Sequence, residues 1–303
     1  MKNQLIIMIY YISDEDVKKY LDIKECINEL RDAFTSYGNK KSYANARDRI
    51  YGDNFILNTM PAYYEKYNIA GLKTYISGKN GVRFVVIIFD VSDPEKLFII
   101  DANTLGQIRT GALTAMVTSL LINKKNINYT LIGSGFQAET QLKAMASIYD
   151  LNNVYVYSKN YEHALNFSKK FDFNIKASRD LSVLKDSDVI TSVTNSKTPI
   201  FDYSMLPEKY HINLVGSNII GRREANNDVL DNSDIVISEN LDQSMKEASE
   251  IIDMKNKNKI VELKDFIINV NKYKVNKSVF KSMGIGLEDI AAGYIVLKNM
   301  KII

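Results

Sequence analysis

The chain has 303 residues, of which 46% are hydrophobic and 25% charged, and its 39 basic and 36 acidic side chains leave a formal charge of +3. This composition excludes a mostly disordered chain, and the even spread of charge offers no dense basic tract for a nucleic-acid backbone. Cys26 is the only cysteine and His163 and His211 are the only histidines, so we expect no disulfide and no metal site, and predict structural or surface roles for both histidines.

The first predicted element is the apolar run from Leu5 to Ile12, which we interpret as a buried strand. It is shorter than the roughly 20 residues of a membrane helix, and an acidic segment follows it where a signal peptide would need small residues. No other apolar run approaches that length. We therefore expect a soluble, cytoplasmic protein with no membrane partner.

An amphipathic helix is predicted over residues 22–36. Asp22 with Glu25 resembles a capping box, and apolar residues then recur at helical spacing as far as Phe34. Cys26 belongs to this apolar stripe, so we interpret its thiol as a small core residue.

Short strands follow between Arg49 and Asp101. The apolar segments 55–60, 70–76, 84–90 and 96–100 are separated by turn residues such as Gly78 and the pair Asn80-Gly81. This pattern predicts a mostly antiparallel sheet.

Beyond Gly111 the pattern becomes one of alternating strands and helices. The expected strands are 127–133, 153–158, 173–178, 188–194, 211–216 and 234–239, and the expected helices include 136–149 and 161–171. Such alternation predicts an α/β protein with a Rossmann-type, doubly wound parallel sheet beside a smaller α+β domain.

Three further segments complete the prediction. The charged stretch from Asp231 to Asn258 is predicted to form a helix, and Lys274 to Leu287 a glycine-containing loop. The apolar helix from Ile290 to Leu297 is expected to return to the first domain.

A dinucleotide-binding loop is predicted at Gly133-Ser134-Gly135, which follows a strand and precedes a helix. Gly133 would make the tight turn and Gly135 would let the backbone approach a pyrophosphate. The following residues Phe136 and Gln137 open the helix and are expected to bind the cofactor as well. Glycine-rich turns also occur without a ligand, but the succession of strands after this one favours dinucleotide binding.

The form of the dinucleotide depends on the end of the next strand, where NAD enzymes usually have an acidic residue for the ribose. This chain has Ser158-Lys159-Asn160 there. A hydroxyl, an ammonium and an amide suit a 2′-phosphate, so NADP(H) is favoured and NAD(H) remains the alternative. The competing interpretation is that Lys159 is an ordinary solvated lysine.

Several of these segments together resemble one family. They are residues 60–62, 71–73, 101–115, 132–144, 211–218 and 280–293. In this order they are similar to the ornithine cyclodeaminase and mu-crystallin family, which includes archaeal alanine dehydrogenases and pyrroline-carboxylate reductases. The resemblance implies a substrate-binding and dimerisation domain over 1–111 with 288–303, a dinucleotide-binding domain over 112–287, and a homodimer formed through the N-terminal sheet.

The resemblance also implies the groups that bind the substrate. Arg47, Lys73 and Arg109 would hold the carboxylate and nitrogen of a small amino or imino acid, with Arg49 as a rival for Arg47. A bidentate guanidinium fixes the plane of such an anion. Each cation considered alone would be read as a surface charge.

The same resemblance assigns the remaining contacts with the cofactor. Thr110 would contact its phosphate, Ser282 and Gly284 would touch the nicotinamide, and Asp289 would be the acidic residue after that loop. A polar turn followed by a helix start is the competing interpretation of the last three.

The sequence departs from the family at Asn218, where the cyclodeaminases have an aspartate. An amide cannot accept a proton, and Asp202 and Glu224 are alternative bases without positional support. We therefore expect Lys73, Arg109 and Asn218 to serve a reductase of a cyclic ketimine such as pyrroline-2-carboxylate, or an alanine dehydrogenase. The alternatives are ornithine cyclodeaminase and a non-catalytic NADP-binding protein.

Overall fold

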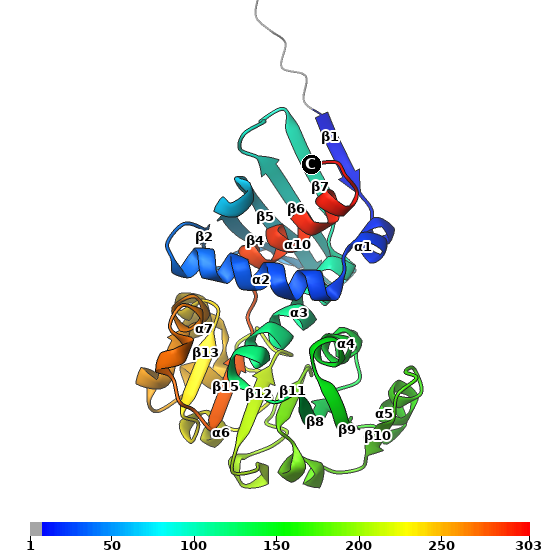
Figure 1. The fold of residues 1–303 in the computed structure, drawn as a ribbon, viewed down its shortest axis with the longest axis vertical. Coiled ribbons are helices and arrows are strands. Elements are labelled where there is room, and N and C mark those ends of the chain that lie inside the picture. The colour runs from blue at the N-terminus through cyan, green and yellow to red at the C-terminus, as the bar shows by residue number, and fades with distance from the viewer. Residues whose placement is uncertain (1–7) are drawn as a thin grey trace, which may run out of the picture. The chain divides into compact units, whose positions relative to one another are not determined.

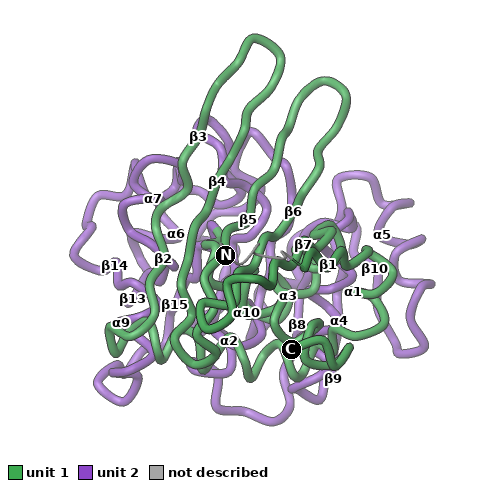
Figure 2. Tube along the Cα trace, turned by 90° about the horizontal axis from the view of Figure 1, so that it is seen from above, with its two compact units in different colours: residues 1–113, 284–303 green, residues 114–283 purple. Residues whose placement is uncertain are grey.

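A computed structural model describes residues 8–303, which divide into two compact units. The first takes the described residues up to Leu113 together with 284–303, and the second is Thr114–Met283 (Figure 2). No helix within residues 8–303 is long and apolar enough to cross a membrane.

The first unit contains a mixed sheet with the strand order β1-β7-β6-β5-β4-β2, in which β3 also pairs with β4. Strands β4 to β7 run antiparallel and β1 pairs in parallel with β7, so the expected mostly antiparallel sheet is confirmed. The strands are β1 Met8–Ile12, β2 Tyr43–Ala44, β3 Asp48–Tyr51, β4 Phe55–Tyr64, β5 Ile69–Gly78, β6 Gly81–Asp90 and β7 Lys96–Asp101.

The strand predicted from Leu5 to Ile12 is correct only in part. Residues 5–7 lie outside the described part of the chain, and Met8–Ile12 forms β1. The expected burial is wrong, because Ile9 is 61% exposed and Tyr11 62%. β1 is an edge strand whose side chains alternate between two faces, and these two lie on the face that no helix of the unit covers.

Helix α10 lies on the other face of this sheet, and α2 packs against α10 (Figure 1). The predicted amphipathic helix is α2, Ile23–Gly38, and Cys26 is fully buried on it, as expected. α10, Gly286–Asn299, approaches β4 so closely that a Cβ on Gly286 would lie 2.1 Å from the carbonyl oxygen of Met60. The unit also contains α1 Asp14–Tyr20 and the 3₁₀ turn η1 Glu65–Tyr67.

The second unit contains an eight-stranded parallel sheet of order β10-β9-β8-β11-β12-β15-β13-β14. The strands are β8 Asn126–Ile132, β9 Asp150–Tyr157, β10 Ile175–Ser178, β11 Val189–Ser192, β12 Tyr210–Leu214, β13 Ile235–Ser238, β14 Ile260–Glu262 and β15 Lys277–Lys281. The parallel α/β fold is thus confirmed. From β8 the chain winds outward to β10 and then returns beside β8 as β11, which makes the carboxyl ends of β8 and β11 the switch point where such folds bind ligands.

The helices of this unit are short apart from α3 Asn103–Leu121, which begins in the first unit. They are α4 Ala138–Ile148, α5 Tyr161–Ser168, α6 Asn227–Asp231, α7 Leu241–Glu247, α8 Ser249–Ile252 and α9 Leu263–Ile267, with 3₁₀ turns η2 Ser182–Asp186, η3 Tyr203–Met205, η4 Lys257–Lys259 and η5 Val270–Lys272.

Two predictions in this unit are wrong. The segment 274–287 contains the buried strand β15, which lies between β12 and β13, so it is not simply a loop. Its apolar centre is flanked by Lys277 and Lys281, and Lys281 is itself fully buried. The stretch 231–258 contains the strand β13 and the short helices α7 and α8 instead of a single helix. The backbone of Ala248 is extended, with φ −97° and ψ 103°, and this separates α7 from α8.

Candidate active site

The site of the first unit is built around Lys73 on β5. Its neighbours in register are Met60 on β4 and Val86 on β6, all on the face covered by α10. Lys73 is 4% exposed, and its Nζ lies 2.9 Å from Oδ1 of Asp289. A buried lysine requires such a partner, because an isolated buried charge is costly.

Arg109 on α3 shares the same carboxylate. Its Nε lies 3.0 Å from Oδ1 of Asp289, and its Nη1 lies 2.5 Å from Oε2 of Glu288. Both acidic residues are fully buried in the first turn of α10. We call this group of four residues, Lys73, Arg109, Glu288 and Asp289, the charge cluster. The charge cluster brings together two of the cations expected at the substrate.

The charge cluster contains two features that suit proton transfer. Burial lowers the pKa of Lys73 to about 8, with a further decrease from the nearby Arg109 and an opposing increase from Asp289. Oδ2 of Asp289 is buried and has no hydrogen-bond partner among the described residues. A substrate N–H would supply that partner.

The structure separates the two rivals for the carboxylate. Nη2 of Arg47 lies 3.5 Å from the carbonyl oxygen of Gly284, whereas Nε of Arg49 donates to Oδ1 of Asn58 at 2.9 Å. Gly284 has φ +77°, and an added Cβ would lie 3.1 Å from Nη2 of Arg109. Arg47 and Arg109 thus approach the same glycine, whereas Arg49 is bound to Asn58.

The glycine loop of the second unit lies at the switch point. Gly133 has φ +108°, and a Cβ there would be 2.8 Å from the carbonyl oxygen of Val193, which follows β11. Gly135 is exposed and an added Cβ would meet nothing within 4 Å. This open backbone can accept a pyrophosphate, as Gly-rich loops do at helix N-termini.

Buried polar atoms at the same edge also suit a ligand. Oε1 of Gln137 and Oγ of Ser217 are buried without a hydrogen-bond partner among residues 8–303. Ser134 is half-buried and Phe136 is 59% exposed. The loop therefore fits a dinucleotide both by its open backbone and by its unsatisfied groups.

The segment expected to bind the ribose follows β9. Ser158 is half-buried and Lys159 is exposed. Oδ1 of Asn160 accepts a hydrogen bond from the backbone N of Glu162 at 3.0 Å, so this amide caps α5 and has less capacity left for a ligand than the sequence suggested.

Two other predicted cofactor contacts already have protein partners. Oγ1 of Thr110 donates to the carbonyl oxygen of Gly106 at 2.6 Å within α3. Oγ of Ser282 donates to Oε1 of Glu239 at 3.0 Å in the second unit.

The sequence model of the ornithine cyclodeaminase/mu-crystallin family matches residues 10–302. The chain belongs to this family. Among its relatives, the alanine dehydrogenase of Archaeoglobus fulgidus is 25% identical over 307 residues, which cover 95% of this chain and 94% of that protein.

Solved structures show the same fold. The Delta(1)-pyrroline-2-carboxylate reductase of Thermococcus litoralis, in complex with NADH and L-proline, matches with a TM-score of 0.88 and 23% identity over 96% of this chain and 97% of that one. An archaeal alanine dehydrogenase dimer with bound NAD matches with a TM-score of 0.86 and 20% identity over 97% of each chain.

Glu224 and Asp202, the two alternative bases considered in place of Asn218, form hydrogen bonds with other residues of the second unit. The carboxylate of Glu224 is fully buried and accepts hydrogen bonds from Ser192 Oγ at 2.6 Å, Thr194 N at 2.6 Å and Gly216 N at 2.7 Å. Glu224 thus ties the ends of β11 and β12 together, just before Asn218.

Asp202 also has a local role, because its Oδ1 accepts from the backbone N of Ser204 at 2.9 Å and caps η3. Both carboxylates thus make structural hydrogen bonds within the second unit. The sequence suggested them as bases only because their side chains are acidic.

Both histidines belong to the second unit, whereas the charge cluster belongs to the first, and each histidine contacts a polar side chain of its own unit. His211 on β12 is fully buried between Ser278 Oγ at 2.9 Å and Asn213 Oδ1 at 3.1 Å, and burial lowers its pKa to about 4. It is neutral at pH 7. His163 is an exposed residue of α5.

Sequence reasoning missed Glu288 as a member of the charge cluster. Its Oε1 accepts from the backbone N of Ile285 at 3.0 Å, which is the capping contact of α10, while its Oε2 binds Arg109. The N-cap position is Ile285 rather than Ser or Thr, so the local sequence carries no capping-box signature that would have drawn attention to Glu288.

Proposed function

We propose that the protein is an NAD(P)H-dependent oxidoreductase that reduces a small α-imino acid, either a cyclic ketimine such as pyrroline-2-carboxylate or the imine formed from pyruvate and ammonia. The observation that carries this proposal is the sharing of Asp289 by Lys73 and Arg109 in a buried, charge-balanced cluster. Family membership and the glycine loop support it.

The chemistry divides among a few groups. The bound nicotinamide would supply a hydride to C-α of the imino acid. Arg47 and Arg109 hold the α-carboxylate in one plane by charge-assisted hydrogen bonds. Lys73, with its pKa lowered to about 8, donates a proton or a hydrogen bond to the substrate nitrogen, and Oδ2 of Asp289 accepts from an N–H of that nitrogen.

The preferred cofactor form is NADP(H). Ser158 and Lys159 offer a hydroxyl and an ammonium at the end of β9, where no carboxylate is present to bind the ribose 2′-hydroxyl. The relatives whose structures are described above hold NADH or NAD, so NAD(H) is the alternative.

Absorbance at 340 nm tests the reaction directly. Purified protein is mixed with NADPH or NADH and either pyrroline-2-carboxylate or pyruvate with ammonium. We expect stoichiometric loss of the reduced nucleotide with at least one of these substrates. Absence of turnover with both, despite nucleotide binding, would favour the non-catalytic alternative.

Ornithine cyclodeaminase is the second candidate, because it gives the family part of its name. That reaction forms proline and ammonia without net change of cofactor. Asn218 argues against it, since an amide cannot take a proton during the loss of ammonia.

The variant Asn218→Asp tests the role of that amide. We expect it to raise proline formation from ornithine above the level of the parent protein, measured by amino-acid analysis, with little change in NADPH binding. Asn227→Asp, which alters an amide on α6, is the charge-matched control. No gain in Asn218→Asp would show that the missing carboxylate is not what limits cyclodeamination.

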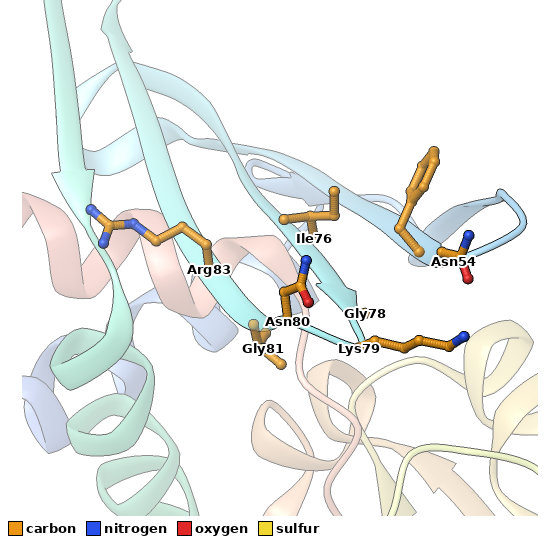
Figure 3. A pocket seen from close by; sticks show the side chains of 9 residues that line it. Asn54, Ile76, Gly78, Lys79, Asn80, Gly81 and Arg83 are labelled. Carbon is orange, nitrogen blue, oxygen red and sulfur yellow. The ribbon is translucent and has the colours of Figure 1, made fainter.

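We also propose that the protein forms a homodimer through the open face of the first sheet. The described residues of that face are all half-buried or exposed, although the face is largely apolar. It includes Ile9, Tyr11, Leu72, Ile76, Ile87, Phe89, Leu97 and Ile99. A cavity of about 450 Å³ lies at the hairpin tips, lined by Phe55, Ile76 and Arg83 among others (Figure 3). Large apolar patches usually mark interfaces.

Replacement of Ile87 by Glu tests the dimer, because it places a charge in the middle of this face. We expect the parent protein to sediment as a dimer and Ile87→Glu as a folded monomer. Glu15→Lys, on the exposed surface of α1, serves as a control. A monomeric parent protein would contradict the proposal.

A further inference from the structure

The carboxyl-terminal edge of the parallel sheet, where the glycine loop and Lys159 follow β8 and β9, is called the nucleotide edge below. Arg179 lies at this edge, and no sequence motif indicated it. It directly follows β10, whose last residue Ser178 pairs in register with Tyr157, the last residue of β9. Ser158 and Lys159 follow Tyr157. Because parallel strands place their carboxyl ends at one edge, Arg179 and Lys159 emerge from neighbouring strands at the same edge of the sheet.

A ring contact fixes Arg179 near this segment. The guanidinium carbon lies 3.9 Å from the centroid of the Tyr161 ring. Tyr161 is the first residue of α5 and is only two residues beyond Lys159. Stacking on an aromatic ring restricts the plane of a guanidinium while leaving the N–H groups at its edge able to donate.

Neither cation has an acidic partner. Both side chains are exposed, and within residues 8–303 neither takes part in an ion pair. The adjacent carboxylate of Asp180 instead accepts from the backbone N of Ser182 at 2.9 Å. Two uncompensated positive charges thus lie at the end of the strand pair β9 and β10.

We propose that Arg179 is a second determinant of the cofactor form and that it binds, together with Lys159, the 2′-phosphate of NADP(H). The inference rests on the proposed function, namely that the second unit binds a pyridine nucleotide. A doubly charged phosphate matches two cations, and a preoriented guanidinium can bind two of its oxygens. The 2′-hydroxyl of NAD(H) gains little from either group.

Calorimetry on the full chain tests this assignment with four probes. NADPH and NADH are compared, as are 2′,5′-ADP and 5′-AMP, which isolate the 2′-phosphate from the rest of the cofactor. The variants are Arg179→Ala and Lys159→Ala. The matched control is Lys176→Ala, which removes an exposed cation on the same strand whose Nζ lies 5.5 Å from the centroid of the Tyr155 ring.

We expect Arg179→Ala to weaken binding of NADPH and 2′,5′-ADP about tenfold, and to change binding of NADH and 5′-AMP by less than about twofold. Lys159→Ala should act in the same direction, whereas Lys176→Ala should leave the ratio of NADPH to NADH affinity unchanged. The difference between the probes should shrink at high salt, because exposed charges are screened.

The outcomes separate this inference from the proposal on which it rests. If the parent protein binds NADH and NADPH but Arg179→Ala weakens both equally or neither, the assignment of the 2′-phosphate is wrong and dinucleotide binding stands. A parent protein that prefers NADH also overturns the inference. If the parent protein binds none of the probes, the proposed function itself fails.

Discussion

The charge cluster of the first unit and the nucleotide edge of the second unit manage charge in opposite ways. At the charge cluster, each buried cation is paired with a carboxylate, so Lys73 and Arg109 are oriented before any ligand arrives. At the nucleotide edge, Lys159 and Arg179 are exposed and have no ion-pair partner in the part of the chain that the structure describes.

This difference reflects burial. A buried lysine without a partner would lose its proton, whereas an exposed one remains charged in water. Internal carboxylates therefore allow the first unit to keep charged groups in its core. At the nucleotide edge, water solvates the exposed cations, so they stay charged without a carboxylate partner.

The largest expected effect is that of Lys73→Met, which removes the proton donor but keeps most of the side-chain volume. We expect kcat/KM for imine reduction to fall by about 10³, since a positioned acid contributes roughly 10²–10⁴. Binding of NADPH should be unchanged by calorimetry. Lys79→Met, at the exposed turn between β5 and β6, is the control. Retention of full activity by Lys73→Met would exclude this lysine from the chemistry.

A smaller but still large effect is expected from Gly135→Val. The added side chain meets no protein atom within 4 Å of its Cβ, and Gly135 is not among the glycines with positive φ, so the unfolding temperature should stay the same. It would, however, occupy the space proposed for the pyrophosphate. We expect the affinity for NADPH to fall by more than about tenfold, with a lesser loss in Gly135→Ala. Equal affinities in all three proteins would contradict the loop assignment.

The pH dependence should reveal the titration of Lys73. Burial lowers its pKa to about 8, so the ammonium is present below that pH and is lost above it. Reduction needs the protonated form, and kcat/KM should therefore decrease about tenfold per unit as the pH rises beyond 8. Oxidation of the amino acid should increase through the same range. A flat profile between pH 7 and 9 would show that another group or solvent moves the proton.

Local signals predicted much of the fold. Short apolar segments separated by turn residues predicted β4 to β7, and the strand, glycine turn and helix over 127–149 predicted the glycine loop at the carboxyl end of β8. The family resemblance, which the comparison with known sequences confirms, indicated Lys73 and Arg109 although they are 36 positions apart in the chain.

The features that were missed depend on contacts between distant segments. β15 ends in Lys281, and a lysine suggests a surface unless one knows that Oε2 of Glu250 lies 3.5 Å from its Nζ. Glu288 could not be recognised from local sequence because its partner Arg109 is 179 positions away. Local patterns do not record which distant charge a buried side chain meets.

The order of synthesis has a consequence for α10, which supplies both carboxylates of the charge cluster and follows Arg109 by some 180 residues in the chain. As the polypeptide leaves the ribosome, Lys73 and Arg109 emerge long before Glu288 and Asp289. Until α10 arrives, a nascent first unit would have to bury two positive charges with no counter-charge, so it cannot close its core early. Synthesis of α10 thus becomes the event that lets the first unit fold.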